Sequence, residues 1–175
     1  VTTHANRILD RAWKLQDAAS YTGVLTDMLE SHHIQFRTYD VTEKVERLVT
    51  QLETEWPDAT FDLDLPDQQH VTGTPKLDVA PEHVLQNAVE HNDSDSPRVA
   101  VSVHSPASDA GYVEVTVADN GPGIPEQEQM VLLEGRETPL EHGSGLGLWI
   151  VNWIVNRSGG RIAFEDNEPR GSRVT

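Results

Sequence analysis

The sequence predicts an α/β fold in which helices cover one face of a mixed β-sheet, preceded by a long N-terminal helix. Some segments place apolar residues three or four positions apart, as helices do, and others place them at every second position, as strands do. After the first helix the predicted order is helix, strand, helix, strand, strand, loop, helix, strand, strand. This order fits a two-layer sandwich with its helices on one side of the sheet.

The composition limits the function before any motif is considered. The 175 residues suffice for one domain with a helical appendage, and 37% hydrophobic residues are enough for a packed core. The absence of Cys excludes a disulfide scaffold, a thiolate zinc site and a cysteine nucleophile. With 29 Asp and Glu against 13 Lys and Arg, the formal charge of -16 argues against a nucleic-acid partner.

The acidic excess is accompanied by a shortage of lysine. Lys14, Lys44 and Lys76 are the only lysines among the 13 basic residues, and the carboxylates are spread along the whole chain. This pattern favours adaptation to molar salt, where screening over about 3 Å removes the self-repulsion of such a charge. An ordinary acidic protein is the alternative.

No apolar run approaches the ~18 residues that a membrane span needs, and no signal peptide opens the chain. We therefore expect no direct membrane contact in this chain and a cytoplasmic location. The abrupt ends indicate a piece of a longer protein, which could be tethered to a membrane through missing upstream segments.

Residues 5–31 are predicted to form the long first helix. Its apolar residues follow one seam with nearly heptad spacing, and a single seam of this length needs a partner helix. We expect it to pack in a homodimer or against a helix upstream. The predicted domains are therefore a helical segment over 1–36 and a sandwich domain over 37–175.

The remaining elements follow from local signals. Asp40 and Glu43 have the spacing of a capping box before a helix over 41–56, and Pro57 ends that helix. A helix around Val84–Val89 is followed by a loop-rich stretch over 119–147. Further elements are a helix over 146–157 that closes at Gly159-Gly160, and strands over 61–65, 98–104, 112–118, 160–164 and 171–175, the last one cut short.

Three polar or glycine-rich clusters carry the candidate chemistry. Asn87 lies on an apolar helix, with His83 one turn before it and Glu90, His91 and Asn92 just after. An Asn in such a setting can equally be an ordinary helix residue that bonds to its surroundings.

The second cluster, Asp119-Asn-Gly-Pro-Gly-Ile-Pro125, directly follows a strand. It can be a plain turn, but its glycines allow a flat ligand to approach the backbone, and its carboxylate can accept a hydrogen bond from an amine.

The third cluster, His142-Gly-Ser-Gly-Leu-Gly-Leu148, opens a helix. Glycines at every second position free backbone amides to face an anion, and the helix N-terminus adds positive potential. The spacing does not match the dinucleotide fingerprint, and no Gly is followed by Lys as in a P-loop.

In this order and spacing, the three clusters resemble the ATP-binding catalytic domain of two-component sensor histidine kinases. This family shares a superfamily (GHKL) with gyrase and Hsp90-type ATPases. Residues 85–92 look like the N box, 119–123 like the first glycine box and 143–147 like the second. The likeness covers about residues 41–175, is greatest to haloarchaeal members, and continues through 152–160 and 166–172.

The resemblance implies a Bergerat-type fold that holds ATP between helices and sheet. Asn87 would ligate Mg²⁺, with His83 and Glu90 beside it in the catalytic region, and Asp119 would accept from the adenine amino group. Residues 124–142 would form a lid. The other expected nucleotide contacts are His91, Asn92, Gly121, Gly123, Ile124, His142, Gly143, Ser144, Gly145, Leu146 and Gly147.

The resemblance also implies an activity and partners. The domain would transfer the γ-phosphoryl group of ATP to a His on an upstream helix absent from this chain, and a response regulator would follow. His4, His32 and His33 lack an acidic residue after them and are expected to be surface residues. His83 stands where hydrolytic relatives have a Glu, which disfavours a chaperone or topoisomerase. A non-catalytic ATP-binding module is the alternative.

Overall fold

The computed structural model describes residues 35–106, 111–126, 129 and 146–175. The chain divides into two compact units, Val1–Ile34 and Gln35–Thr175, and the described residues belong to the second. The predicted helix over 5–31 and the glycine cluster at 143–145 lie outside the described residues. The division into domains at 36 and 37 therefore stays a prediction.

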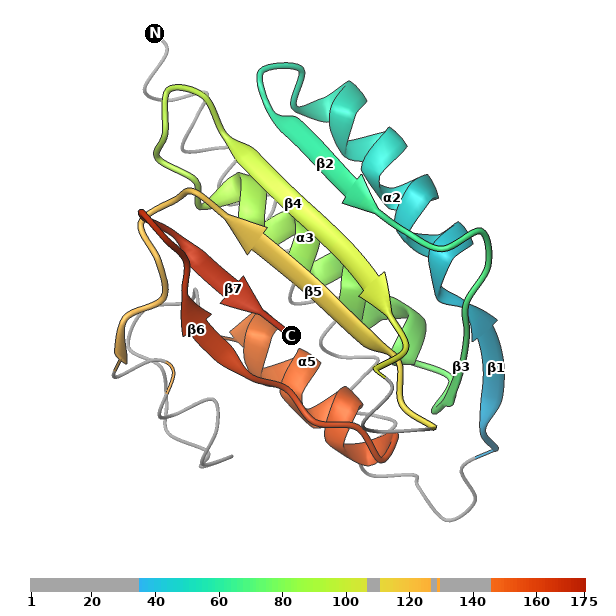
Figure 1. Cartoon of the computed structure of the whole chain (residues 1–175). Coiled ribbons are helices and arrows are strands. Elements are labelled where there is room, and N and C mark those ends of the chain that lie inside the picture. The colour runs from blue at the N-terminus through green and yellow to red at the C-terminus, as the bar shows by residue number, and fades with distance from the viewer. Residues whose placement is uncertain (1–34, 107–110, 127–128, 130–145) are drawn as a thin grey trace, which may run out of the picture. The chain divides into compact units, whose positions relative to one another are not determined.

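A five-stranded mixed sheet forms one layer of the second unit (Figure 1). The edge strand β2 runs parallel to β4, whereas the pairs β4–β5, β5–β7 and β7–β6 are antiparallel. The strands, in spatial order, are β2 (Thr60–Asp64), β4 (Arg98–His104), β5 (Glu114–Asp119), β7 (Ser172–Val174) and β6 (Phe164–Asp166).

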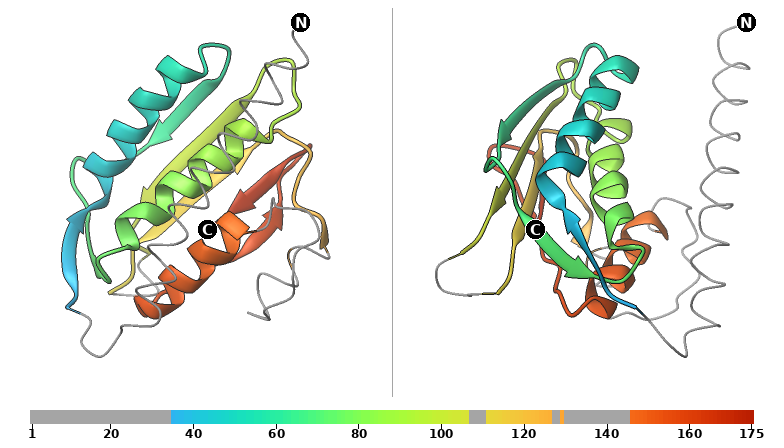
Figure 2. Two further views of the ribbon diagram at one scale, coloured as in Figure 1. Left: turned by 180° about the vertical axis from the view of Figure 1, so that it is seen from behind. Right: turned by 90° about the vertical axis from the view of Figure 1, so that its right-hand side faces the viewer.

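Three helices cover one face of this sheet, as the edge-on view in Figure 2 shows. They are α2 (Val41–Glu55), α3 (Ala80–Glu90) and α5 (Leu146–Arg157). α3 packs against both α2 and α5 and lies against β4 and β5. The predicted sandwich with its helices on one face of a mixed sheet is thus confirmed.

The strand register explains which side of the sheet the helices cover. Val101 of β4 lies opposite Val117 of β5, which lies opposite Val174 of β7. All three are buried, and they form a row against which the apolar sides of the helices pack. The helix residues buried in this core include Val45, Leu48, Leu52, Val84, Leu85, Val89, Ile150 and Ile154.

Asp40 caps α2 as the sequence predicts. Its carboxylate accepts from the backbone N–H groups of Thr42 (3.1 Å) and Glu43 (3.3 Å). Burial alone would raise the pKa of Asp40, but hydrogen bonds from Gln68 and two backbone N–H groups lower it below the ordinary 3.8. The cap therefore stays ionised at neutral pH.

The end of α5 also follows the sequence. Gly159 has φ +83, which an L side chain rarely adopts. Its N–H bonds the carbonyl of Asn156 (3.0 Å), and the N–H of Gly160 reaches back to the carbonyl of Val155 (2.9 Å). These two bonds make a Schellman motif, which fixes the direction in which the chain leaves the helix.

Two strands were not predicted, and one was misplaced. β1 (Arg37–Asp40) and β3 (His70–Gly73) form a separate antiparallel pair of four-residue strands, whose mostly polar residues give no alternation to detect. A short 3₁₀ helix (Leu77–Val79) also escaped prediction. The strand expected over 160–164 lies instead at β6, because the Schellman turn occupies its first residues.

No helix in the described part of the chain has both the length and the hydropathy that crossing a bilayer requires.

Candidate functional site

The carboxylate of Asp119 is the buried polar centre of the candidate site. It ends β5 with 8% of its surface exposed. Its Oδ1 accepts from the backbone N–H groups of Gly121 (2.7 Å) and Ser172 (3.4 Å), and its Oδ2 accepts from the Ser172 hydroxyl (2.5 Å). Because these donors fix the orientation of the carboxylate, Asp119 is a preorganised acceptor.

The β6–β7 hairpin holds the backbone of Asp119 as well. The side-chain amide of Asn167 donates to the Asp119 carbonyl (2.8 Å). A Cβ built on Gly171 would come within 1.9 Å of that same carbonyl oxygen, and Gly171 has φ +121. Only glycine fits there, because both the conformation and the close approach exclude a side chain.

From the sequence, Asn167, Gly171 and Ser172 have no predicted role beyond their place in the stretch 166–172 that resembles histidine kinases. The one local signal was the Gly-Ser pair after a Pro-containing turn, which marks a tight connection. It gives no sign that Ser172 lies against Asp119, 53 positions earlier in the chain.

Asn120 joins the glycine cluster to the loop that follows α3. Its Oδ1 accepts from the backbone N–H of Arg98 (2.8 Å) and from the side chain of Asn92 (3.1 Å). Its Nδ2 donates to the Ser94 hydroxyl (3.3 Å) and the Ser96 carbonyl (3.1 Å). All its polar atoms are engaged, so this side chain fixes the distance between the two segments.

The same network brings the first two sequence clusters together. A Cβ on Gly121 would lie 3.3 Å from Cα of Asn92, so these two backbones nearly touch. The Asn92 side chain is used locally: its amide nitrogen bonds Ala88 and Asn120, and its oxygen accepts from the Ser94 N–H. Its expected contact with phosphate stays a prediction.

The other candidates on α3 share one side of the helix. His83, Asn87 and His91 are spaced by four residues, and Glu90 lies beside them. His83 and Asn87 are half-buried, whereas Glu90 and His91 are exposed. The opposite side of α3 carries the buried core residues Val84, Leu85, Ala88 and Val89.

The third cluster is described only in part. His142, Gly143, Ser144 and Gly145 lie outside the described residues, Leu146 begins α5, and Gly147 is buried. Before the gap, Gly123 has φ +83, and the half-buried Ile124 accepts at its carbonyl from the Gln129 side chain (2.7 Å). The first glycine box thus leads directly into the stretch expected to form a lid.

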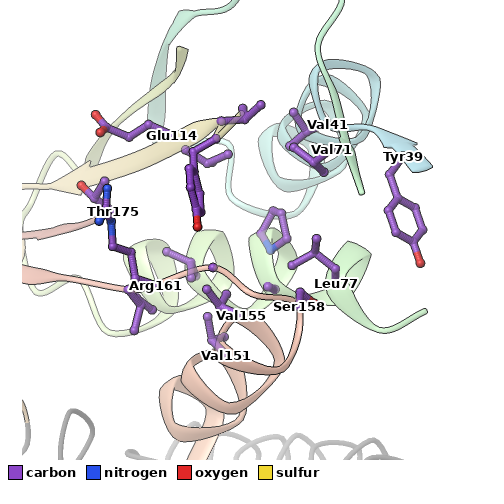
Figure 3. Close-up of a pocket in the computed structure, with 18 of the residues that line it drawn as sticks. Tyr39, Val41, Val71, Leu77, Glu114, Val151, Val155, Ser158, Arg161 and Thr175 are labelled. Atoms are coloured by element: carbon purple, nitrogen blue, oxygen red, sulfur yellow. The ribbon is translucent and has the colours of Figure 1, made fainter. Parts of the chain in front are cut away.

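A cavity of about 780 Å³ lies at the other end of the sandwich. The start of β5, the end of α5 and the β1–β3 pair line it, and none of the described candidate site residues does. Figure 3 shows Val151 and Val155 of α5 facing this space. The candidate site and the cavity are therefore separate.

An exposed ion pair stands beside the candidate site. Nη2 of Arg170, in the β6–β7 hairpin, lies 2.7 Å from Oδ2 of Asp93 in the loop after α3. The hydrogen bond from Arg170 lowers the pKa of Asp93 below its ordinary 3.8. The β6–β7 hairpin thus contacts both Asp119, at the end of β5, and the loop after α3.

Fold and site together define an ATP-binding domain of the kind shared by histidine kinases. Residues 75–175 match the family model described as "Histidine kinase-, DNA gyrase B-, and HSP90-like ATPase". The chain belongs to this family.

The chain is similar to known histidine kinases. The chain is 30% identical over 168 residues to the signal transduction histidine-protein kinase/phosphatase MprB of Mycobacterium sp. (strain KMS). That match covers 91% of this chain but spans only 32% of the relative's length. The chain therefore spans about a third of the length of this mycobacterial relative.

Solved structures of histidine kinases are also similar to this chain. A mycobacterial sensor histidine kinase MprB superposes with a TM-score of 0.64 at 30% identity, covering 80% of this chain and 94% of its own. The ATP-binding domain of PrrB from Mycobacterium tuberculosis gives 0.62 at 28%, covering 79% and 93%. The histidine kinase ThkA, solved in complex with response regulator protein TrrA, shares the fold at 0.66 and 19% identity, covering 93% and 47%.

Proposed function

We propose that this chain carries the ATP-binding catalytic domain of a protein-histidine kinase in a two-component system. It would transfer the γ-phosphoryl group to a His on an upstream helix absent from this chain. The bond from phosphorus to the bridging oxygen breaks, ADP leaves, and a phosphorus–nitrogen bond forms on the imidazole. The preorganised, buried carboxylate of Asp119 is the observation that carries this proposal.

Asp119 would select adenine. Its fixed oxygens can accept a hydrogen bond from the exocyclic amine of adenine, whereas the carbonyl at the same position of guanine would repel them. Gly121 and Gly123 would leave room for the base, because neither carries a side chain. Gly143, Gly145 and Gly147, with the start of α5 at Leu146, would direct backbone amides toward the phosphates, helped by His142 and Ser144.

Asn87 would hold Mg²⁺ together with the nucleotide. Its half-buried side chain offers one amide oxygen, and the described residues contain no group of three His, Asp or Glu side chains able to bind a metal by themselves. This suits Mg²⁺, which commonly keeps waters and takes its other ligands from phosphate oxygens. His83, Glu90, His91 and Asn92 would line the phosphate side, and Mg²⁺ would offset the phosphate charge.

The parts of the system beyond this domain are also proposals. The segment over 1–36 would form a homodimer through its apolar seam, and a response regulator would receive the phosphoryl group. The domain would work in the cytoplasm. The shortage of lysine favours a haloarchaeal type, in which high salt screens the charge of -16.

Nucleotide binding tests the site directly. Asp119→Asn keeps the size of the side chain but replaces one acceptor oxygen with a donor, so it should weaken binding of a fluorescent ATP analogue by tenfold or more, about 1.4 kcal/mol. Asp62→Asn, at an exposed position on the edge strand, is the matched control. Equal affinity of Asp119→Asn and the parent chain would rule out the adenine role.

Phosphotransfer separates the kinase from the alternative, a non-catalytic module that uses ATP to set dimer geometry or partner affinity. Labelled ATP should leave the present chain unlabelled but should label a longer chain that includes the upstream helix. Binding of ATP without transfer in the longer chain would favour the module instead.

A further inference from the structure

The pair Asn120–Gly121 carries a chemistry that the proposed nucleotide site does not use. It is the one Asn-Gly pair in the sequence, and every other Asn is followed by a residue with a side chain. An Asn before Gly deamidates readily in an unfolded chain, because Gly has no side chain to shield its backbone nitrogen. The folded chain must therefore either allow this reaction or prevent it.

The reaction takes place within the chain. The backbone nitrogen of Gly121 attacks Cγ of Asn120, a nitrogen–carbon bond forms, and the bond from Cγ to Nδ2 breaks. The proton lost by the Gly121 nitrogen goes to the leaving amide, which departs as ammonia and leaves a five-membered succinimide. Water then opens this ring, to Asp if the bond to Cγ breaks and to isoaspartate if the bond to the main-chain carbonyl breaks. The attack therefore requires the Gly121 nitrogen to lose its proton and to reach Cγ.

The attacking nitrogen is engaged elsewhere in the folded chain. The Gly121 N–H donates to Oδ1 of Asp119 at 2.7 Å, so the carboxylate holds the proton that the reaction must remove. Gly121 is also buried, and a Cβ built on it would lie 3.0 Å from that same oxygen and 3.3 Å from Cα of Asn92. Solvent base therefore reaches this N–H only when the loop opens.

The carboxamide under attack is held as well. The Oδ1 of Asn120 accepts from the Arg98 N–H and the Asn92 side chain, and its Nδ2 donates to Ser94 and Ser96. All four partners belong to the loop after α3 and the start of β4, so the side chain is bonded away from its own backbone. Nδ2 would have to give up both of its bonds before it could leave as ammonia.

The products would not fit the folded backbone. A Cβ built on Gly171 would lie 1.9 Å from the carbonyl oxygen of Asp119 and 3.0 Å from Cα of Asn120, so the main chains are in close contact here. Isoaspartate routes the main chain through Cγ and lengthens it by one atom. A chain that has reacted should therefore lose the position of Asp119 against the β6–β7 hairpin.

We propose that Asn120–Gly121 is a latent deamidation site, which the hydrogen bond from Gly121 to Asp119 and the bonds to the Asn120 side chain keep closed in the folded chain. Asp119 then has a role in protecting the chain that does not depend on nucleotide. The reaction occurs only in molecules in which this network has opened, so its rate reports the open fraction.

The unaltered full chain provides the first test. It is aged in mildly alkaline buffer with and without denaturing urea, and mass spectrometry of digests follows the conversion of each asparagine. In urea, Asn120 should react faster than any other Asn; without urea, its rate should fall by about a hundredfold or more, as expected of a site that reacts only on opening. Equal rates for Asn120 in the two buffers would overturn the proposal, and so would a faster reaction of another Asn in urea.

Two variants separate this network from overall stability. Ser94→Ala removes one hydrogen-bond partner of Nδ2 and should speed the reaction of Asn120 in the folded chain severalfold. Val45→Ala weakens the buried core beside α2 instead, and should have the lower urea midpoint but the slower reaction. An unchanged rate in Ser94→Ala would contradict the proposal, and so would a faster reaction in Val45→Ala, because global unfolding would then be what exposes the site. No nucleotide is present in either test, so both stand even if the proposed function fails.

Discussion

The hydroxyl of Ser172 donates to Oδ2 of Asp119 at 2.5 Å, while the Ser172 backbone N–H approaches the other carboxylate oxygen at 3.4 Å. One residue of β7 therefore holds both oxygens of the buried acid that ends β5. The two residues are separated by 53 positions in the sequence. The orientation of the carboxylate thus depends on correct pairing of β7 with β5.

Removing the Ser172 hydroxyl should leave the Asp119 carboxylate less firmly held. Ser172→Ala leaves a buried carboxylate with one donor fewer, so we expect a loss of about 1–3 kcal/mol in the free energy of unfolding. Nucleotide affinity should fall with it. Ser172→Thr keeps the hydroxyl and is the control. Urea unfolding measures the loss of stability, and binding of a fluorescent ATP analogue measures the loss of affinity. If Ser172→Ala changed neither, Ser172 would not be what holds the Asp119 carboxylate.

Gly171 should tolerate no side chain. In Gly171→Ala, the new Cβ would meet the Asp119 carbonyl oxygen at 1.9 Å, and the backbone would also be strained at φ +121. Gly111 provides a matched control, because its φ of +115 imposes similar strain but nothing lies within 4 Å of a Cβ built on it.

Gly111→Ala should therefore cost only the strain, about 1–3 kcal/mol. Gly171→Ala should cost distinctly more and should also weaken nucleotide binding, because it displaces Asp119. Thermal unfolding of both variants would check this. Equal losses would mean that the backbone near Asp119 relaxes and that close packing there is unimportant.

Asn120 should stabilise the junction between the first glycine box and the loop after α3. Asn120→Ala removes all its hydrogen bonds, so we expect a loss of roughly 2–3 kcal/mol in stability and a weaker nucleotide complex. Asn120→Asp keeps the oxygen that accepts from the Arg98 N–H and should lose less. Asn156→Ala is the control, since the Asn156 side chain bonds within its own helix, to Asn152.

Urea denaturation would rank the three variants. If Asn120→Ala and Asn156→Ala were equally stable, the network around Asn120 would contribute nothing to the fold.

The sequence predicted most of the fold because its signals there are local. α2 and α5 were predicted within a residue of their observed bounds, since capping residues, prolines and glycines mark their ends. β4 was found from strict alternation. β1 and β3 were missed because each strand has a single apolar or aromatic side chain, Tyr39 or Val71, and because their pairing depends on contacts about 30 residues apart.

The candidate site was predictable only in part. Asp119 and Asn87 could be picked out from their motifs. The donors that hold Asp119 could not, because Ser172 and Asn167 approach it through strand pairing, which no local pattern records. The local use of the Asn92 side chain was also hidden, since it depends on where Asn120 lies.

The pair of Asp93 and Arg170 should give a small pH-dependent stabilisation. The pKa of Asp93 is lower in the folded chain than its ordinary 3.8, so folding favours the ionised form. The stabilisation is complete above that ordinary value and is lost as the pH falls through the lower folded pKa. Because both side chains are exposed, added salt should weaken it.

Asp93→Asn would reveal this contribution. The variant should be slightly less stable than the parent chain at neutral pH and equal to it in strong acid. Unfolding curves between pH 2 and 7, at low and high salt, would measure the difference, with the exposed Asp62→Asn as control. A difference that persisted unchanged in acid would show that charge is not its cause.

Nucleotide binding should strengthen with salt. The predicted lid carries five glutamates against one basic residue, Arg136, so the approach of ATP phosphates should meet repulsion that molar KCl screens. The lid glutamates are Glu126, Glu128, Glu134, Glu137 and Glu141. We expect affinity for an ATP analogue to rise severalfold from dilute buffer to molar KCl.

A variant with Glu134, Glu137 and Glu141 all changed to Gln should bind well in dilute buffer and respond little to salt. Changing the exposed Glu46, Glu53 and Glu55 of α2 removes the same charge elsewhere and should leave the salt response intact. If both triple variants responded alike, net charge and not the lid would govern binding. A steady fall in the parent chain's affinity with rising KCl would contradict the adaptation to high salt but would leave the adenine assignment of Asp119 untouched.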